Sequence, residues 1–430
     1  MKRLAVLGTA ATFAIASIAA VPRTAHAQLT MQMSNGWSLS FSGNVNAFEV
    51  QSIGIDSVNS ILYGIANPGE GTVNRVRTGL LPAFAVFDVK GKEGPVDLGV
   101  HFGFAPQIQT GSSCSSSGGQ QHDNFGCGTQ AGAQIDMRQV YLTVGGSWGQ
   151  ILAGREIGLY QRQNILTDMT LTGVGASGGQ TGAGGTTLGR IGFGYTYPNF
   201  NAQITYSTPA TMDVQWSIGL FDPSALNGEG TVQANFTKIP RIETELSWTG
   251  KMGTPAAGAA SNKVMVWVGG VWQEASFAGF VPSGASDSTR SAEGADFGVK
   301  FDIGQLSIVG SGYYDEGVGT TLMFTTTAGF DATGQGRKSF GYIGQIQFKI
   351  DPKWTVGASL GASNLLLTDN DRLTDNLGLL KDNLDGSAMI TYQWTKSLRF
   401  VGEYDYIESV NYAFQSNKVN QLAAGFMLFF

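Results

Sequence analysis

The chain is poor in the residues from which most enzyme sites are built. Among its 430 residues there are two cysteines and three histidines, and only 13% of the residues are charged. Beyond the first 27 residues the only histidines are His101 and His122, and no GxSxG motif for a serine nucleophile occurs. We therefore expect no enzyme and no cofactor. A barrel hydrolase with a serine nucleophile outside any motif stays open as the alternative.

An excess of basic residues is also lacking. The chain carries 26 lysines and arginines against 32 acidic residues, which gives a net charge of −6. Proteins that bind nucleic acid need a basic face. The composition therefore argues against a nucleic-acid partner.

Long apolar runs are lacking except at the start of the chain. Two basic residues precede an apolar run over residues 4–21, and the small residues Ala25 and Ala27 follow it. This is the pattern of a secretory signal peptide, so we predict a signal peptide over residues 1–27 and a mature chain over residues 28–430. A retained membrane helix is the alternative, but the run is short for a hydrocarbon core of about 30 Å.

The two cysteines, Cys114 and Cys127, lie close together in a polar stretch rich in glycine and serine. In an exported protein such a pair forms a disulfide, which we predict here. Metal binding with help from His122 and Asp123 is the alternative. The spacing of these four residues matches no zinc pattern.

No proline-rich or charged linker divides the chain. Glycine is frequent, with 61 residues, and 42% of the residues are hydrophobic. Glycine, β-branched and aromatic residues at this density favour strands and turns over helices. We therefore predict one closed all-β unit, with two soluble β domains as the alternative.

Short segments in which apolar and polar residues alternate recur along the chain. Clear examples are residues 37–47, 296–303, 340–350 and 398–406. Such alternation gives a strand one apolar face and one wet face. A soluble sandwich also alternates, but its apolar faces must meet in a core.

The lengths of the segments and of their connections favour a membrane barrel. Segments of about 10 residues, joined alternately by tight turns and long polar loops, are typical of barrels that span an outer membrane. Short connections lie at residues 145–149, 351–353 and 395–397, and long ones lie at residues 110–133, 317–337 and 368–382. The long loops therefore gather at one rim.

The strand number of such a barrel is even, because both chain ends lie on the periplasmic side. The candidate segments reach an even number when residues 189–197 are assigned to a central loop and residues 201–209 and 213–223 to the next two strands. This assignment gives about 16 strands, a number that leaves an aqueous channel. The connection at residues 251–262 is then unusually long for the periplasmic side.

The central loop, residues 158–200, fits neither the helical nor the strand pattern. It contains ten glycines between Gly173 and Gly194 and little charge. An insert of this length without regular structure is unusual in a compact domain and indicates a functional loop. We expect it to fold into the barrel and to narrow the bore.

Aromatic residues cluster at the predicted strand ends. Trp37, Trp354 and Trp394 fall near the periplasmic rim, and Tyr314 and Tyr406 fall towards the outer rim. Interfacial aromatic girdles of membrane barrels have this arrangement. A buried aromatic core is the alternative.

The end of the chain resembles the terminal strand of Gram-negative outer-membrane barrels. Its last residues place on one face Leu422, Ala424, Phe426, Leu428 and Phe430. Further segments are similar to the Gram-negative general porins, namely RTGL at residues 77–80, RQVYLTVGGSWGQILAGRE at residues 138–156 and ITYSTP at residues 204–209. The resemblance implies an outer-membrane, 16-stranded antiparallel β-barrel that forms homotrimers, contacts lipid and lipopolysaccharide, and folds its third outer loop inward.

In that family, basic side chains of the wall face carboxylates of the third loop across the narrowest point. The wall candidates that the resemblance implies here are Arg75, Arg77, Arg138 and Arg155. Alternation turns the first two inward. Arg138 shares its parity with Val140, and Arg155 shares its parity with Ile151, so Arg138 needs a bulge to face the lumen. A contact with the rim or with lipid headgroups is the alternative for each arginine.

The central loop departs from the family pattern, because Asp168 is its only carboxylate after Glu156. The field across the constriction is then weaker, or carboxylates of the barrel wall complete it. Wall candidates are Glu243, Glu245, Asp302 and Glu403. The charge selectivity of the pore stays open at this point.

Two further motifs are weaker. Residues 369–376 (DNDRLTDN) space their carboxylates somewhat like a calcium loop, but the glycine and the distal glutamate are missing. We expect a solvated outer loop there, with a divalent-cation site as the alternative. Residues 333–339 (TGQGRKS) have the wrong glycine spacing for a phosphate-binding loop and precede a strand.

These patterns predict a water-filled pore for passive diffusion of small hydrophilic solutes and ions. Apolar residues outward suit the bilayer, and closed strand pairing satisfies the backbone. Loop width then sets the size limit and fixed charges bias ions. The alternatives are a channel selective for one class of solute and a structural barrel whose lumen is plugged by the central loop.

Overall fold

The structure is a computed structural model. It describes residues 29–34, 36–56, 71–108, 135–177, 186–229, 233–253, 262–277, 289–324 and 329–430. The predicted signal peptide and the predicted disulfide between Cys114 and Cys127 lie outside the described residues, as do His122 and Asp123.

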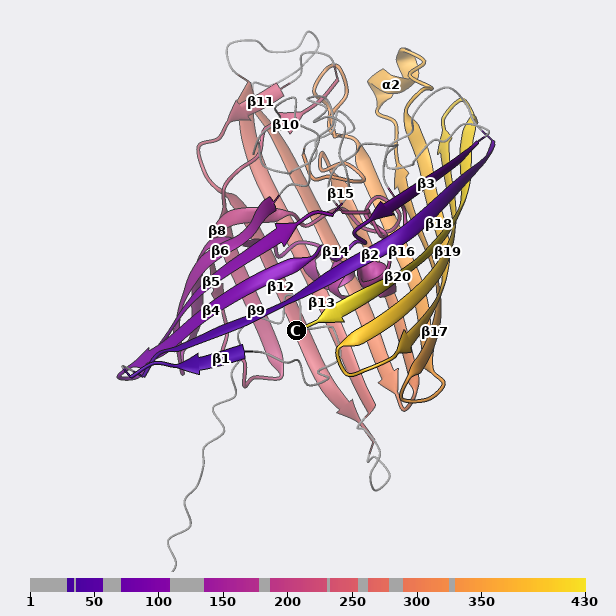
Figure 1. Cartoon of the computed structure of the whole chain (residues 1–430). Coiled ribbons are helices and arrows are strands. Elements are labelled where there is room, and N and C mark those ends of the chain that lie inside the picture. Colours follow the sequence, from indigo (N-terminus) through magenta and orange to yellow (C-terminus); the bar gives the residue numbers. More distant parts are fainter. Residues whose placement is uncertain are drawn as a thin grey trace, which may run out of the picture.

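A closed antiparallel barrel of 16 strands makes up the body of the molecule (Figure 1). Its first eight strands are β2 (Ser38–Asp56), β4 (Phe84–Glu93), β5 (Val96–Pro106), β6 (Ile135–Gly146), β7 (Gly149–Ile157), β8 (Phe200–Ser207), β9 (Val214–Phe221) and β12 (Arg241–Met252). The other eight are β13 (Asn262–Phe277), β14 (Thr289–Ile303), β15 (Leu306–Glu316), β16 (Lys338–Lys349), β17 (Trp354–Leu365), β18 (Leu380–Gln393), β19 (Leu398–Asn411) and β20 (Ser416–Phe429). Pairing of β20 with β2 closes the barrel, which confirms the predicted fold class.

Short elements complete the structure. Four short strands are β1 (Leu29–Gln32), β3 (Thr72–Arg77), β10 (Leu226–Asn227) and β11 (Gln233–Phe236), and the helices are α1 (Arg162–Thr167), η1 (Met169–Thr172) and α2 (Asp369–Leu373). Strand β3 pairs with the outer half of β2, and β4 pairs with its other half. Among the described residues, no helix has the length and apolar character needed to cross a membrane.

The predicted alternation of connection lengths is confirmed. The predicted tight connections join β6 to β7, β16 to β17 and β18 to β19 at one end of the barrel, while α2, β10 and β11 lie at the other end (Figure 1). The two strands predicted after the central loop are β8 and β9. Residues 189–197 contain only isolated bridges, as their assignment to the loop required. The long connection at residues 251–262 joins β12 to β13, whose pairing ends at Met252 and Asn262.

The strands turn apolar side chains outward and mostly polar ones inward. In β20, Leu422 and Phe426 are exposed on one face of the strand. Asn417 and Gln421, on the other face, are buried. Trp394 (60% exposed) and Tyr314 (50% exposed) also lie on the outer surface. These exposed apolar and aromatic side chains form the surface that a membrane barrel presents to lipid.

Candidate functional site

The central loop leaves the wall after β7 and returns at β8, so it spans residues 158–199, and its described residues lie inside the barrel. It begins with α1 and η1 and continues through segments without regular structure. Its side chains and backbone contact inward residues of strands that lie far along the chain. The predicted inward fold of this loop is confirmed.

Carboxylates of the wall bind backbone N–H groups of the loop. Glu243 of β12 accepts hydrogen bonds from the N–H groups of Leu159 (2.7 Å) and Tyr160 (3.1 Å). Glu403 of β19 accepts from the N–H of Val174 at 2.9 Å. Such charge-assisted bonds are stronger than bonds between neutral groups. These two carboxylates therefore hold opposite ends of the helical part of the loop.

Two arginines of the loop add ion pairs to the same wall. Arg162 binds Glu245 of β12 through two bonds, from Nη2 at 2.7 Å and from Nε at 3.0 Å. Arg190 is fully buried and donates to the backbone oxygen of Asp385 and to the Ser359 hydroxyl. A guanidinium that binds both carboxylate oxygens fixes orientation as well as distance. The loop is thus attached to β12, β17, β18 and β19.

Neutral side chains fill the spaces between these charged contacts. Trp267 of β13 is 1% exposed and donates from Nε1 to Asn164 of α1 at 2.8 Å. Gln345 of β16 accepts from the N–H of Met169 at 2.7 Å. The attachment is therefore continuous along the wall from β12 to β19.

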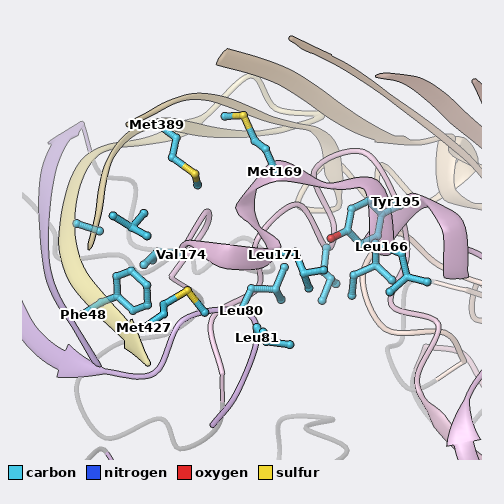
Figure 2. Close-up of a cluster of buried hydrophobic side chains, with 14 of the residues drawn as sticks. Phe48, Leu80, Leu81, Leu166, Met169, Leu171, Val174, Tyr195, Met389 and Met427 are labelled. Atoms are coloured by element: carbon cyan, nitrogen blue, oxygen red, sulfur yellow. The ribbon is translucent and has the colours of Figure 1, made fainter. Parts of the chain in front are cut away.

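Apolar residues of the loop pack against apolar residues that the wall turns inward. Figure 2 shows Leu166, Met169, Leu171 and Val174 of the loop among side chains from the wall and from residues 78–83. Wall members labelled there are Phe48, Met389 and Met427. The lining of the barrel is therefore apolar at the level of the loop. Burial of this apolar surface is the driving force that keeps the loop inside.

Residues 78–83, which connect β3 to β4, also turn into the barrel and will be called the inserted segment. The N–H groups of Leu80 and Leu81 donate to the oxygens of Gly173 (3.0 Å) and Leu171 (3.2 Å). Gly79 permits this approach, because a Cβ there would lie 2.2 Å from the Gly173 oxygen. The inserted segment therefore adds hydrogen bonds that hold the loop from the side of β2 and β4.

Asp168, the predicted constriction carboxylate, is buried within the loop itself. Its oxygens accept from the N–H of Thr170 at 2.9 Å, from the Thr170 hydroxyl at 2.7 Å and from the Tyr195 hydroxyl at 2.8 Å. Burial raises the pKa of Asp168 above its usual range, against the charge of Arg190 and these hydrogen bonds. This side chain therefore stabilises the fold of the loop.

Arg75 and Arg77 lie on the inward face of β3, as alternation predicts. Val76 between them is 63% exposed on the outer face. Arg77 is buried and donates to the backbone oxygens of Ser177 and Thr186, each at 2.9 Å. These two residues flank loop residues 178–185, which lie outside the described part of the chain.

Arg138 occupies a β-bulge. Strand β5 pairs Gly103 with Gln139 and Phe104 with Met137, so Arg138 is the extra residue of β6. Its Nε binds Asp136 at 2.7 Å and Nη1 lies 3.4 Å from the Tyr197 hydroxyl. The bulge that an inward Arg138 needs is therefore present.

By its strand pairing Arg155 falls on the outward face of β7, as its shared parity with Ile151 predicts. It pairs with Val140 of β6 and with Ala202 of β8, whose side chain is exposed. The pairing of β6 with β7 ends at Val140 and Arg155, so the two strands separate beyond these residues, away from their connecting turn. Alternation without a bulge at Arg155 explains the difference from Arg138.

The remaining predicted carboxylates have different surroundings. Glu243 and Glu245 serve as loop anchors, as described above. Asp302 lies near the short-turn end of β14, half-exposed and 3.8 Å from Lys300. It is therefore remote from the central loop along its strand.

The structure adds anchors that sequence reasoning did not select. Asp296 of β14 is buried and accepts from the N–H of Gln161 at 3.0 Å, although its polar position in an alternating strand looked like ordinary lumen lining. Arg162 and Arg190 were detectable as the two cations of a loop that is otherwise short of charge. The wall that they face carries an excess of carboxylates. This charge complementarity between loop and wall was the signal by which Arg162 and Arg190 could have been selected as anchors.

The outer loop at residues 369–376 uses its acidic residues in hydrogen bonds and ion pairs. Asp371 binds Arg337 in a bidentate pair at 2.6 and 2.7 Å, and Asp369 binds Arg372 at 3.0 Å. Arg337 also binds Glu229 of the β9–β11 connection at 2.9 Å. Within the described residues, no cluster of three or more metal-ligating side chains occurs. The acidic residues here join outer loops to one another.

Comparison with known proteins agrees with this architecture. A family model for the Gram-negative porins matches residues 11–412. No curated protein sequence matches the chain. The outer membrane channel DcaP of Acinetobacter baumannii shares 14% identity at a TM-score of 0.61, over 93% of this chain and 99% of that one.

Two porin structures show the same likeness of fold. The anion-selective porin from Comamonas acidovorans has 10% identity and a TM-score of 0.57, over 92% of this chain and 100% of that one. OmpF of Salmonella typhi, in complex with daunomycin, has 12% identity and a TM-score of 0.53, over 94% and 100% of the two chains. The match of the family model across nearly the whole chain shows that this protein belongs to the Gram-negative porins, outer-membrane channels for passive diffusion of solutes.

Proposed function

We propose that solutes cross this barrel on one side of the central loop, between the loop and the wall formed by strands β4 to β6. The loop is attached to β12, β14, β16 and β19 by hydrogen bonds from its backbone N–H groups to side-chain oxygens of Glu243, Asp296, Gln345 and Glu403. These hydrogen bonds hold the loop against strands β12 to β19. The open part of the bore therefore lies on the other side of the loop, next to strands β4 to β6.

The charges of the two walls support a preference for anions. The carboxylates of β12, β14 and β19 are buried and already bind N–H groups or arginines of the loop. Arg75 and Arg138 lie on the wall across the bore. A solute on the proposed path therefore meets the guanidinium groups of Arg75 and Arg138, the second of which is paired with Asp136. Fixed charges of one sign along a path favour ions of the opposite sign.

Single-channel recording in asymmetric salt tests this proposal. We expect a reversal potential that reports anion preference, and we expect Arg75→Gln to move that potential towards zero. Lys396→Gln is the matched control, because Lys396 lies exposed in the turn between β18 and β19 and carries the same charge. A cation preference of the native protein would refute the proposed path.

A plugged structural barrel is the second candidate, favoured by the many buried contacts of the loop. The double variant Glu243→Gln, Glu403→Gln separates the two functions because it weakens attachment at both ends of the loop. A diffusion pore conducts before the change and more strongly after it. A plugged barrel changes from closed to open.

We further propose that the chain forms homotrimers in contact with lipid and lipopolysaccharide, is exported by the signal peptide over residues 1–27, and joins Cys114 to Cys127. The exposed apolar surface of the strands supports the membrane contact. Chemical cross-linking of the folded protein gives a trimer if this is right and only monomers if it is wrong. Intact mass of the exported protein tests cleavage after Ala27, and a loss of two protons tests the disulfide.

A further inference from the structure

A second level of inward side chains lies beyond the wall residues that bind the central loop. On four strands, the residue four positions closer to the short-turn end of the barrel than a loop-binding residue is basic. These pairs are Trp267 with Lys263 on β13, Asp296 with Lys300 on β14, Gln345 with Lys349 on β16 and Glu403 with Arg399 on β19. Residues four apart share one face of a strand and lie about 13 Å apart along it. The four basic side chains therefore face the lumen on the short-turn side of the loop.

Two more inward lysines complete this level. Lys251 of β12 lies on the same face as Glu245 and is paired with Lys263 of β13. Lys90 lies on the same face of β4 as Phe84, which is buried in the barrel. The six residues will be called the basic ring: Lys90, Lys251, Lys263, Lys300, Lys349 and Arg399. Because they lie on β4 as well as on β12 to β19, an ion that passes the loop on either side also passes the basic ring.

Carboxylates do not neutralise the basic ring. The inward carboxylates at this end, among the described residues, are Asp88, Asp97 and Asp302. Asp97 binds Lys92, a further inward lysine, at 2.9 Å, and Asp302 lies 3.8 Å from Lys300. Seven inward basic side chains thus face three carboxylates, an excess of four positive charges. The rim beside them carries Glu93, Asp213, Asp351, Lys353 and Lys396. These rim residues sum to one negative charge, so this end of the lumen stays positive.

Two members of the basic ring, Lys251 and Lys263, lie directly opposite each other in neighbouring strands. The Cβ atoms of such a pair are about 5 Å apart, and like charges there destabilise a sheet. The neighbouring Asp302 has its ion pair with Lys300, and among the described residues neither of the two opposed lysines forms an ion pair. Lys300 lies opposite Met265, which makes it the diagonal neighbour of Lys263 at about 7–8 Å. Three ammonium groups therefore lie within reach of one anion.

An anion with several charges gains most from this arrangement. Lysine ammonium groups bind phosphate and carboxylate oxygens as point charges. An anion that contacts two or three of them relieves their mutual repulsion, whereas a monovalent anion contacts one at a time. The screening length falls from about 30 Å at 0.01 M salt to about 10 Å at 0.1 M. Retention of a polyvalent anion should therefore depend strongly on ionic strength.

We infer that the basic ring is a binding region for oxyanions with two or more negative charges, centred on Lys251, Lys263 and Lys300. This inference rests on the proposed function, because it names the class of anions that the proposed preference favours most. It adds a second level of selection to that of Arg75 and Arg138. Monovalent anions pass this level freely, and polyvalent oxyanions dwell there.

Equilibrium binding to the folded protein in uncharged detergent tests the inference without relying on conduction. Tripolyphosphate is the polyvalent probe, and acetate at equal ionic strength is the monovalent comparison. At about 0.01 M salt, isothermal titration should show saturable binding of tripolyphosphate, at least about tenfold tighter than binding of acetate. The affinity should fall when the salt is raised to about 0.1 M. No saturable binding of tripolyphosphate, or an affinity equal to that of acetate, would overturn the inference.

A pair of double variants locates the site. Lys251→Gln with Lys263→Gln should weaken tripolyphosphate binding at least about tenfold. Lys338→Gln with Lys418→Gln is the matched control, because it also removes two lysines, which lie at the outer ends of β16 and β20 beside Glu316 and Glu408. The control should retain the native affinity. Equal weakening in both double variants would show attraction to overall charge and would overturn the inference.

Single-channel recording of the same preparations separates this inference from the proposed function. A native reversal potential that reports cation preference refutes the proposed path, whereas the tripolyphosphate titrations still decide the basic ring. An anion preference that Arg75→Gln reduces, without saturable binding of tripolyphosphate, supports the path and refutes the ring. Circular dichroism of each variant confirms that the barrel is folded.

Discussion

Glu403 illustrates how a single inward carboxylate fixes a segment of backbone in this barrel. It is buried and binds the N–H groups of Val174 and Gly175. A charged acceptor removed from water is stable only when donors replace the lost solvent. The loop supplies those donors from its main chain, so the contact depends little on which side chains the loop carries.

We expect Glu403→Gln to lower the free energy of unfolding by about 1–3 kcal/mol, because the amide is a weaker acceptor and introduces an extra donor. Denaturant unfolding followed by circular dichroism measures this change. Glu408→Gln is the control, since Glu408 lies on the outer face of the same strand, 3.6 Å from Lys418. An equal loss in both variants would contradict the anchoring role of Glu403.

The ion pair of Arg337 with Asp371 forms a joint between outer loops. We expect this joint to be sensitive to acid. Burial alone favours neutral Asp371, but hydrogen bonds from Arg337 and Thr368 together with the charge of Arg337 hold the pKa of Asp371 below its usual range. A lowered pKa in the folded state stabilises the joint above the unfolded pKa of about 3.9. That stabilisation is lost as the pH falls through the folded value.

Hydrogen exchange of residues 366–379, corrected for the intrinsic effect of pH, should therefore increase as the pH is lowered below about 4. Asp371→Asn should show the faster exchange already at neutral pH. Asp369→Asn is the control, because Asp369 is exposed and pairs only with Arg372 among the described residues. Unchanged protection of the native loop down to acid pH would exclude this joint.

At the scale of elements, the inserted segment and the bulge in β6 decide the form of the bore. Neither is a regular element, and each diverts one strand for a few residues. The inserted segment interrupts the β3–β4 strand so that Leu80 and Leu81 contact the loop, and the bulge directs Arg138 inward. Local irregularities of this kind reposition side chains without disturbing the rest of a sheet.

Gly79→Ala should displace the inserted segment from the loop, because the added Cβ would lie 2.2 Å from the Gly173 oxygen and 2.9 Å from the ring of Phe48. We expect a larger single-channel conductance and a less stable barrel. Gly344→Ala in β16 is the control, since nothing lies within 4 Å of its added Cβ. An unchanged conductance in Gly79→Ala would mean that the inserted segment does not limit the bore.

The regular elements could be predicted from the sequence, whereas the contacts between them could not. Alternation in β2 and β20, and the lengths of the turns, depend on local pattern alone. The inward position of Phe48 breaks that pattern, because its partners are in a loop more than a hundred residues away. Arg155 shows the converse, since its pairing follows ordinary alternation.

At the scale of the whole molecule, the central loop joins the two halves of the barrel. It follows β7, yet its anchors lie on β12 to β19, and Gln421 of β20 donates to the Gly175 oxygen at 2.6 Å. All of these strands follow the loop in sequence. Contacts of such large sequence separation form late, because chain entropy is lost before they can be made.

Refolding should therefore proceed in two observable stages. Circular dichroism should report sheet formation first, and the fluorescence of Trp267, which donates to Asn164 of the loop, should change afterwards. The difference between the native protein and Trp267→Phe isolates this signal from the other tryptophans. Simultaneous changes in both signals would show that the loop is seated while the sheet forms.

The wall carboxylates have a consequence for this order of events. Before the loop arrives, Glu243, Asp296 and Glu403 have only water as partners for the oxygens that later bind the loop. We therefore expect the newly closed cylinder to be a wide and acidic conduit with a preference for cations. Entry of the loop neutralises that lining, so under the proposed anion preference the last folding step reverses the sign of the ions that the molecule favours.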